Sequence, residues 1–117
     1  MGDTRSVDDD VRAFLARHVS TFNAAVASGD FEPLVALFAE DASLEFVGVP
    51  AGPFVGRDAI AAAYGSQPPD DALEVVSVDE EPGGVVLERF VWHRGGTGTM
   101  RVTLADGRIA RLVVAFD

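Results

Sequence analysis

The sequence predicts an α+β fold in which a curved antiparallel sheet wraps around three helices. Before residue 72 the apolar residues recur mostly at helical spacing, and after it they alternate in strands separated by tight turns. Helices followed by a set of strands are typical of an architecture in which the helices cover one face of the sheet. At 117 residues the chain is expected to form a single domain, 1–117, with 1–7 as a flexible tail.

The first helix is predicted from one apolar stripe and from the residues at its two ends. Ser6 or Asp8 can cap its start, and Gly29 lies where a left-handed residue commonly ends a helix. The stripe consists of Val11, Phe14, Leu15, Val19, Phe22 and Val26.

The remaining elements follow from shorter patterns. A second, short helix is predicted with Asp30 as its N-cap, Pro33 in its first turn, and an apolar face of Leu34, Leu37 and Phe38. After it come a strand over 43–48, a Pro/Gly-rich loop over 49–55 and a third helix over 56–64. Four strands joined by tight turns then predict an antiparallel meander over 72–79, 84–93, 97–104 and 108–116.

Composition excludes several classes of function. There is no cysteine, which rules out disulfides, thiolate catalysis and cysteine-ligated metal sites. The net charge is −10 and the nine basic residues, all arginines, are spread along the chain, so binding to nucleic acid is not expected. No signal peptide or membrane span is predicted, and the expected location is the cytoplasm. The expected partner is an apolar small molecule or another protein chain.

Three segments, in this order, resemble the nuclear transport factor 2-like superfamily, which includes ketosteroid isomerases and SnoaL-like polyketide cyclases. They are NAAVASGDFEPLVALFAEDASLEF, GPFVGRDAIAAAY and LADGRIARLVVAFD. The resemblance covers residues 11–117 and implies a cone-shaped apolar pocket between the helices and the sheet. It implies no single reaction, because isomerases, cyclases, hydrolases and non-catalytic binders share this fold.

The isomerase branch of this superfamily has its catalytic groups where this chain has apolar residues. Its general base would fall at Phe46, its oxyanion-binding tyrosine at Phe22, and its second oxyanion donor near Met100. A supporting tyrosine of that network has a match at Tyr64. The resemblance therefore implies a ligand pocket lined by Phe22, Phe46, Tyr64 and Met100, and it argues against dienol chemistry by that route.

The acidic residues of the segment 36–46 are predicted to be structural or surface groups. Glu40 and Asp41 are expected in a turn between helix and strand, where carboxylates are solvated. Glu45 alternates with Leu44 and Phe46, so it faces outward if those two face the interior.

The turn at Gly95–Gly96 decides which face of the 84–93 strand lines the pocket. We favour a two-residue turn, which places Arg89 and His93 on the inner wall and leaves Phe90, Trp92 and Arg101 on the outer face. That outer patch predicts a homodimer through the sheet. A one-residue change in the turn would instead bring Glu88 and Trp92 inside.

The last turn poses a similar choice. A three-residue loop over 105–107 is favoured, because it keeps the larger apolar residues of the final strand on the inner face. Those residues are Ala110, Leu112, Val114 and Phe116. A two-residue turn at Asp106–Gly107 would put Arg111 inside.

Four polar residues are site candidates, each with a structural alternative. Tyr64 is the best candidate: its phenol could donate a hydrogen bond to a carbonyl or oxyanion, or it could bridge core and surface. Arg89 could neutralise a carboxylate or enolate, or could pair with a nearby acid. His93 could be a general base or an exposed loop residue, and His18 a catalyst or a histidine at the edge of the core. No metal or cofactor is predicted.

Two functions follow from these features. One is an isomerase or cyclase acting on an apolar, carbonyl-bearing ligand. The other is a non-catalytic ligand-binding or dimerisation module on the same fold.

Overall fold

The first helix, α1 (Asp9–Ser28), begins and ends as predicted. In the computed structural model, which describes residues 8–117, the Asp8 carboxylate accepts a hydrogen bond from the Asp10 amide at 3.0 Å. At the other end Gly29 has φ 81° and its amide donates to the carbonyl of Ala25 at 2.7 Å. Ser6 as an alternative cap and the predicted flexible tail, 1–7, lie outside the described residues.

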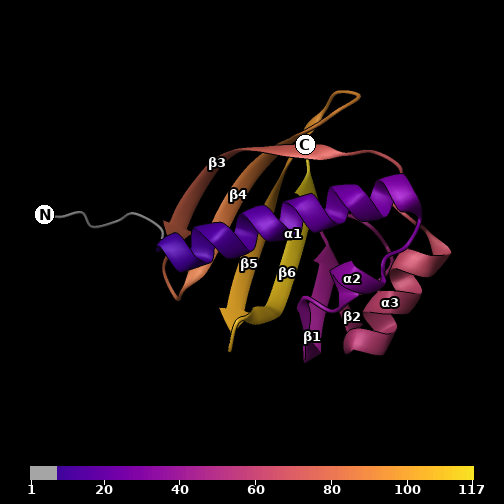
Figure 1. Cartoon of the computed structure of the whole chain (residues 1–117), viewed down its shortest axis with the longest axis horizontal. Coiled ribbons are helices and arrows are strands. Elements are labelled where there is room, and N and C mark those ends of the chain that lie inside the picture. Colours follow the sequence, from indigo (N-terminus) through magenta and orange to yellow (C-terminus); the bar gives the residue numbers. More distant parts are fainter. Residues whose placement is uncertain (1–7) are drawn as a thin grey trace, which may run out of the picture.

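The strands form one curved sheet in the order β2-β1-β6-β5-β4-β3, shown in Figure 1. Their bounds are β1 Phe38–Phe46, β2 Phe54–Val55, β3 Leu73–Glu81, β4 Val85–Trp92, β5 Thr97–Ala105 and β6 Arg108–Phe116. The predicted antiparallel meander is confirmed from β3 to β6, while β1 joins β6 as a parallel neighbour. The fold class is therefore α+β, as predicted.

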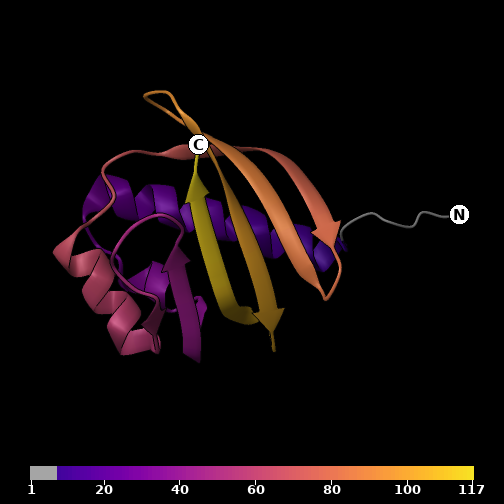
Figure 2. The same cartoon turned by 180° about the vertical axis from the view of Figure 1, so that it is seen from behind.

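The helices lie on one side of this sheet. Helix α1 runs across the inner face, and α2 (Glu32–Val35) and α3 (Arg57–Ser66) lie at the end near β1 (Figure 1). Seen from behind, the outer face of β3 to β6 carries no helix in the described part of the chain (Figure 2). No helix within residues 8–117 is long and apolar enough to cross a membrane.

The second helix is shorter than predicted, and the first strand begins earlier. Helix α2 ends at Val35, and Phe38 is the first residue of β1 instead of the last apolar position of a helix. Glu40 and Asp41 therefore lie in an exposed, irregular part of β1, not in a turn. Phe38 is fully buried there, because its strand adds to β6 at the centre of the fold.

Glu45 faces outward, as predicted. Its neighbours Leu44 and Phe46 pair with Leu112 and Val114 of β6 on the inner face. The Glu45 carboxylate lies 3.5 Å from the guanidinium of Arg111, and the two side chains are 42% and 60% exposed, respectively. An exposed ion pair of this kind contributes little to stability.

The favoured register of the β4–β5 hairpin is wrong, and the alternative is the one adopted. Val91 pairs with Thr97 instead of Met100, a shift of three residues, and an odd shift exchanges the two faces of a strand. Glu88 and Trp92 consequently face inward and Arg89 faces outward. The proposed outer patch of Phe90, Trp92 and Arg101 does not exist, since Phe90 is buried on the inner face and Arg101 is exposed on the other. Homodimerisation stays a prediction, now without that surface.

The turn between β5 and β6 is also not the favoured one, yet Leu112, Val114 and Phe116 face inward as predicted, while Ile109 takes the buried position expected for Ala110. Asp106 and Gly107 form a two-residue turn with φ 52° and 76°, and Ala105 pairs with Arg108. A bulge then leaves Ala110 without a direct partner, because Leu104 pairs with Ile109 and Thr103 with Arg111. The extra residue returns Leu112 and Val114 to the inner face and keeps Arg111 outside.

Candidate functional site

A cavity of about 700 Å³ opens between the inner face of the sheet, α1, α3 and the loop that follows β1. Its wall is mainly apolar, and its volume is in the range of small-molecule sites. The apolar lining includes Val19, Phe22, Leu44, Phe46, Phe54, Leu73, Phe90, Trp92, Met100, Leu112, Val114 and Phe116. The polar lining includes His18, Tyr64, Gln67, Asp70, Asp71 and Arg94.

The cavity brings together some of the predicted site residues and excludes others. Phe22, Phe46, Tyr64 and Met100, together with His18, line it. Arg89 and His93 do not: both are exposed, Arg89 on the outer face of β4 and His93 at the start of the hairpin loop. The inner-wall placement predicted for these two residues is therefore wrong, and the shifted hairpin register is the reason.

Aromatic rings form a continuous part of the wall. The ring of Phe116 stacks on those of Phe46 and Trp92, with centroid distances of 6.3 Å and interplanar angles of 7° and 19°. Phe54 meets Phe46 edge to face at 6.4 Å, and Phe22 lies 6.3 Å from Trp92. These faces offer planar, apolar ligands a large contact area.

His18 lies at the middle of α1 and is only 2% exposed. Its Nδ1 atom has no hydrogen-bond partner among the described residues, and its ring packs edge to face against Phe38 at 6.5 Å. Burial lowers the pKa of the imidazole to about 4, because a charged ring would lose its hydration. At neutral pH this residue is a neutral donor and acceptor on the cavity wall.

Tyr64 projects from α3 into the same cavity. Its ring stacks on Phe31 at a centroid distance of 5.4 Å with an interplanar angle of 4°, which fixes its direction. Burial raises the pKa of the phenol well above its ordinary range. The hydroxyl is therefore a neutral hydrogen-bond donor at physiological pH.

Glu88 is a buried acid that the favoured register had placed outside. The residue is 1% exposed, and its Oε1 atom has no hydrogen-bond partner among residues 8–117. It lies opposite Met100 and two positions before Phe90, both of which line the cavity. Burial raises the pKa of its carboxyl to about 7. In the sequence, only the alternative register of the β4–β5 hairpin predicted that Glu88 faces inward.

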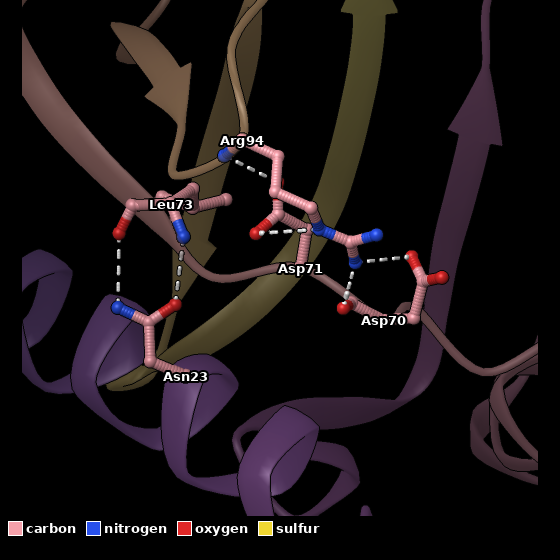
Figure 3. Close-up of polar contacts among 5 residues, drawn as sticks. All are labelled: Asn23, Asp70, Asp71, Leu73 and Arg94. Carbon is pink, nitrogen blue, oxygen red and sulfur yellow. Dashed lines mark hydrogen bonds and ion pairs between the residues drawn. The ribbon is translucent and has the colours of Figure 1, made fainter.

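Arg94 lines the cavity. It joins two loops, as Figure 3 shows. Its guanidinium lies 3.3 Å from the Asp70 carboxylate and 3.6 Å from that of Asp71, and it also donates to the Asp70 carbonyl. The Arg94 amide donates to Asp71 at 3.0 Å. Sequence analysis missed this cluster, because Arg94 is more than twenty positions from the two aspartates and no local pattern links them.

Asn23 holds the same region to α1. Its side-chain amide donates to the carbonyl of Leu73 and its oxygen accepts from the amide of Leu73, each at 2.9 Å (Figure 3). The start of β3 is thereby fixed between α1 and the Arg94 loop. Among residues 8–117, no three His, Asp or Glu side chains gather closely enough to hold a metal ion.

Comparison with known families and structures agrees with this geometry. The model of the SnoaL-like domain matches residues 19–112, which is most of the chain. No curated protein matches the sequence.

Solved structures share the fold at low sequence identity. A candidate isomerase from Bacillus subtilis is 17% identical, with 94% of this chain and 90% of that one covered and a TM-score of 0.74. A candidate ketosteroid isomerase from Kribbella flavida is 21% identical, with 93% and 78% covered and a TM-score of 0.71. The epoxide hydrolase/cyclase-like enzyme SalBIII, which has a role in pyran ring formation in the polyether salinomycin, is 18% identical, with 91% and 89% covered and a TM-score of 0.71. At such identities these likenesses establish the fold alone.

Proposed function

Because the chain belongs to the SnoaL-like domain family, we propose that its cavity binds an apolar, carbonyl-bearing small molecule and that the protein isomerises or cyclises it. One observation carries the proposal: an open cavity of about 700 Å³ with a mainly apolar wall, in which the two buried polar side chains, His18 and Tyr64, lie among apolar ones. An apolar cavity with a few polar groups is the usual form of a small-molecule site. A module for association alone would be expected to fill this space with side chains.

Tyr64 is the proposed hydrogen-bond donor to the carbonyl oxygen of the ligand. Its hydroxyl is neutral because burial raises the pKa of the phenol, so it can donate without bringing a charge into the cavity. A donor aimed at an oxygen that becomes negative stabilises the transition state more than the ground state. Tyr64 would therefore favour formation of an enolate.

His18 is the proposed base. Its imidazole is neutral in the empty cavity, where burial lowers its pKa to about 4, and a neutral imidazole has a lone pair that can accept a proton. A nearby negative charge favours the protonated form. An enolate forming in the cavity would thus strengthen this base as the reaction proceeds.

Proton exchange tests this mechanism without knowledge of the natural substrate. The protein would be incubated in heavy water with α-tetralone and with a steroid enone, and loss of the proton next to the carbonyl would be followed by nuclear magnetic resonance. We expect exchange above the uncatalysed rate, reduced about 100-fold or more in His18→Gln and in Tyr64→Phe. The matched control is His93→Gln, on the exposed hairpin, which should exchange like the parent. Exchange that is unchanged in both cavity variants would overturn these roles.

The second candidate function is non-catalytic binding of the same class of ligand. It is favoured by the phenylalanines and methionine at the three positions where the isomerase branch has its catalytic groups, Phe22, Phe46 and Met100. A ligand at 100 times its dissociation constant adds about 2.7 kcal/mol to the native state, which a thermal-shift assay detects. Binding without proton exchange in the parent would support this second function.

A further inference from the structure

The charged groups on the cavity wall leave an excess of negative charge. Of the titratable residues that line it, His18 and Tyr64 are buried and neutral. The others are two carboxylates, Asp70 and Asp71, and one guanidinium, Arg94. The wall therefore carries one net negative charge, in a chain whose net charge is −10.

The guanidinium of Arg94 already pairs with two aspartates through its Nε and Nη2 atoms. Both neighbouring carboxylates approach it, Asp70 to 3.3 Å and Asp71 to 3.6 Å, and the carbonyl of Asp70 accepts a further hydrogen bond from it (Figure 3). Within the described part of the chain no other cation lines the cavity. An arginine on a pocket wall commonly indicates a carboxylate ligand, but here a ligand anion would compete with two carboxylates of the protein for the same guanidinium.

We propose that the cavity selects neutral ligands over their carboxylate counterparts, and that Asp70 and Asp71 determine this specificity. The inference rests on the proposed function, because it assumes that the cavity binds an apolar carbonyl compound. A carboxylate that enters the apolar interior loses its hydration and finds no counter-ion there. At the rim it meets Asp70, whose side chain is 89% exposed, and the negative potential of the whole chain.

Matched ligands test this selectivity. Methyl naphthoate, acetonaphthone and the naphthoate anion share one planar ring system, and only the last is charged at neutral pH. Their dissociation constants would be measured by titration calorimetry at low salt, where charge effects are least screened. We expect the ester and the ketone to bind at least about tenfold more tightly than the anion, a difference of about 1.4 kcal/mol.

Variants locate the determinant. Asp70→Asn/Asp71→Asn keeps the side-chain size, leaves an oxygen at position 71 to accept from the Arg94 amide, and frees the guanidinium. We expect it to improve naphthoate binding about tenfold and to change ester binding less than about threefold. The matched control is Glu74→Gln/Asp79→Asn, which removes the same charge from exposed positions of β3 outside the cavity. It should leave the preference for the ester in place.

Each result has one meaning. The inference would be supported if the parent and the control variant prefer the ester to the anion and the Asp70→Asn/Asp71→Asn variant does not. Equal or tighter binding of naphthoate by the parent would overturn it and leave the proposed function standing. Failure of all three compounds to bind would overturn the proposed function, and the inference with it. If the double variant does not fold, Asp70→Asn alone decides, because the Asp70 side chain is 89% exposed. Tighter naphthoate binding, with ester binding within about threefold of the parent, supports the inference, and unchanged or weaker naphthoate binding overturns it.

Discussion

Glu88 lies directly opposite Met100 across the β4–β5 pair, so a carboxyl group is buried in the same row of the inner sheet face as the cavity wall. The register of one hairpin puts it there, and the group has an oxygen without a hydrogen-bond partner among residues 8–117. The stability that the protein loses by burying this carboxyl depends on pH, so it can be measured.

Replacing Glu88 by glutamine should stabilise the protein progressively as pH rises. Burial raises the pKa of this carboxyl from 4.5 to about 7, so the folded state holds a proton that the unfolded state has released. Stability is therefore unaffected below pH 4.5 and is lost as pH rises to about 7, by about 3 kcal/mol in total. Urea unfolding of Glu88→Gln and parent across this range should show the difference growing with pH. Glu74→Gln, on the surface, is the control, and a difference that does not vary with pH would contradict the prediction.

Burial of His18 should make the stability of the protein depend on pH in the opposite direction. Burial lowers the pKa of its imidazole from 6.5 to about 4, so the unfolded state binds a proton that the folded state refuses. Stability is complete above pH 6.5 and is lost as pH falls to about 4, by about 3 kcal/mol. The His18→Gln variant should lose less stability in this range than the parent, and the control is His93→Gln. Parallel curves for His18→Gln and parent would refute the assignment.

Gly98 should not tolerate a methyl group. A Cβ atom added there would lie 2.5 Å from Cζ of Phe90 and 2.6 Å from the carbonyl oxygen of Ala115, both closer than van der Waals contact. We expect Gly98→Ala to lower the free energy of unfolding by about 1–3 kcal/mol, as overpacking does. In the control Gly65→Ala, in helix α3, a Cβ atom meets nothing within 4 Å, and we expect a gain of about 0.5–1 kcal/mol. Equal melting temperatures for the two variants would contradict this packing.

Asn23 should stabilise the protein through its two hydrogen bonds to the backbone of Leu73. Alanine removes both and leaves part-buried backbone groups unpaired, at a cost of about 1–3 kcal/mol. Asn23→Asp keeps the acceptor but sets a second carboxylate oxygen against the Leu73 carbonyl oxygen, so it should be no more stable than Asn23→Ala. The exposed Ser20→Ala, on the same helix, is the control. Chemical denaturation orders the four proteins, and an Asn23→Ala as stable as Ser20→Ala would show that the bonds contribute nothing.

Much of the fold could be predicted because short-range patterns determine it. The caps at Asp8 and Gly29 act within one turn of α1. The alternation of apolar residues in β3 to β6, together with the turn residues between these strands, predicts an antiparallel meander. The predicted second helix is too long because Leu37 and Phe38 continue its apolar spacing. In the structure Phe38 instead begins β1 and packs beside β6, where it gains more contact.

The register of β4 could not be predicted from its residues. Apolar side chains lie on both faces of this strand, with Val86, Phe90 and Trp92 inside and Val85 and Val91 on the other face. The hydrophobic pattern therefore does not choose between the faces. Packing beneath α1 determines which face of β4 is buried, and it places Glu88 inside together with the aromatic rings.

The sequence by itself determined the fold class, because helices and strands follow local patterns, and its resemblance to a known family pointed to Phe22, Phe46, Tyr64 and Met100, which line the cavity. Tertiary structure alone decided that His18 is buried without a partner at Nδ1 among the described residues, and that Arg94 reaches Asp70 and Asp71. These features depend on loops and faces that are distant in the chain, where an offset of one residue exchanges inside for outside.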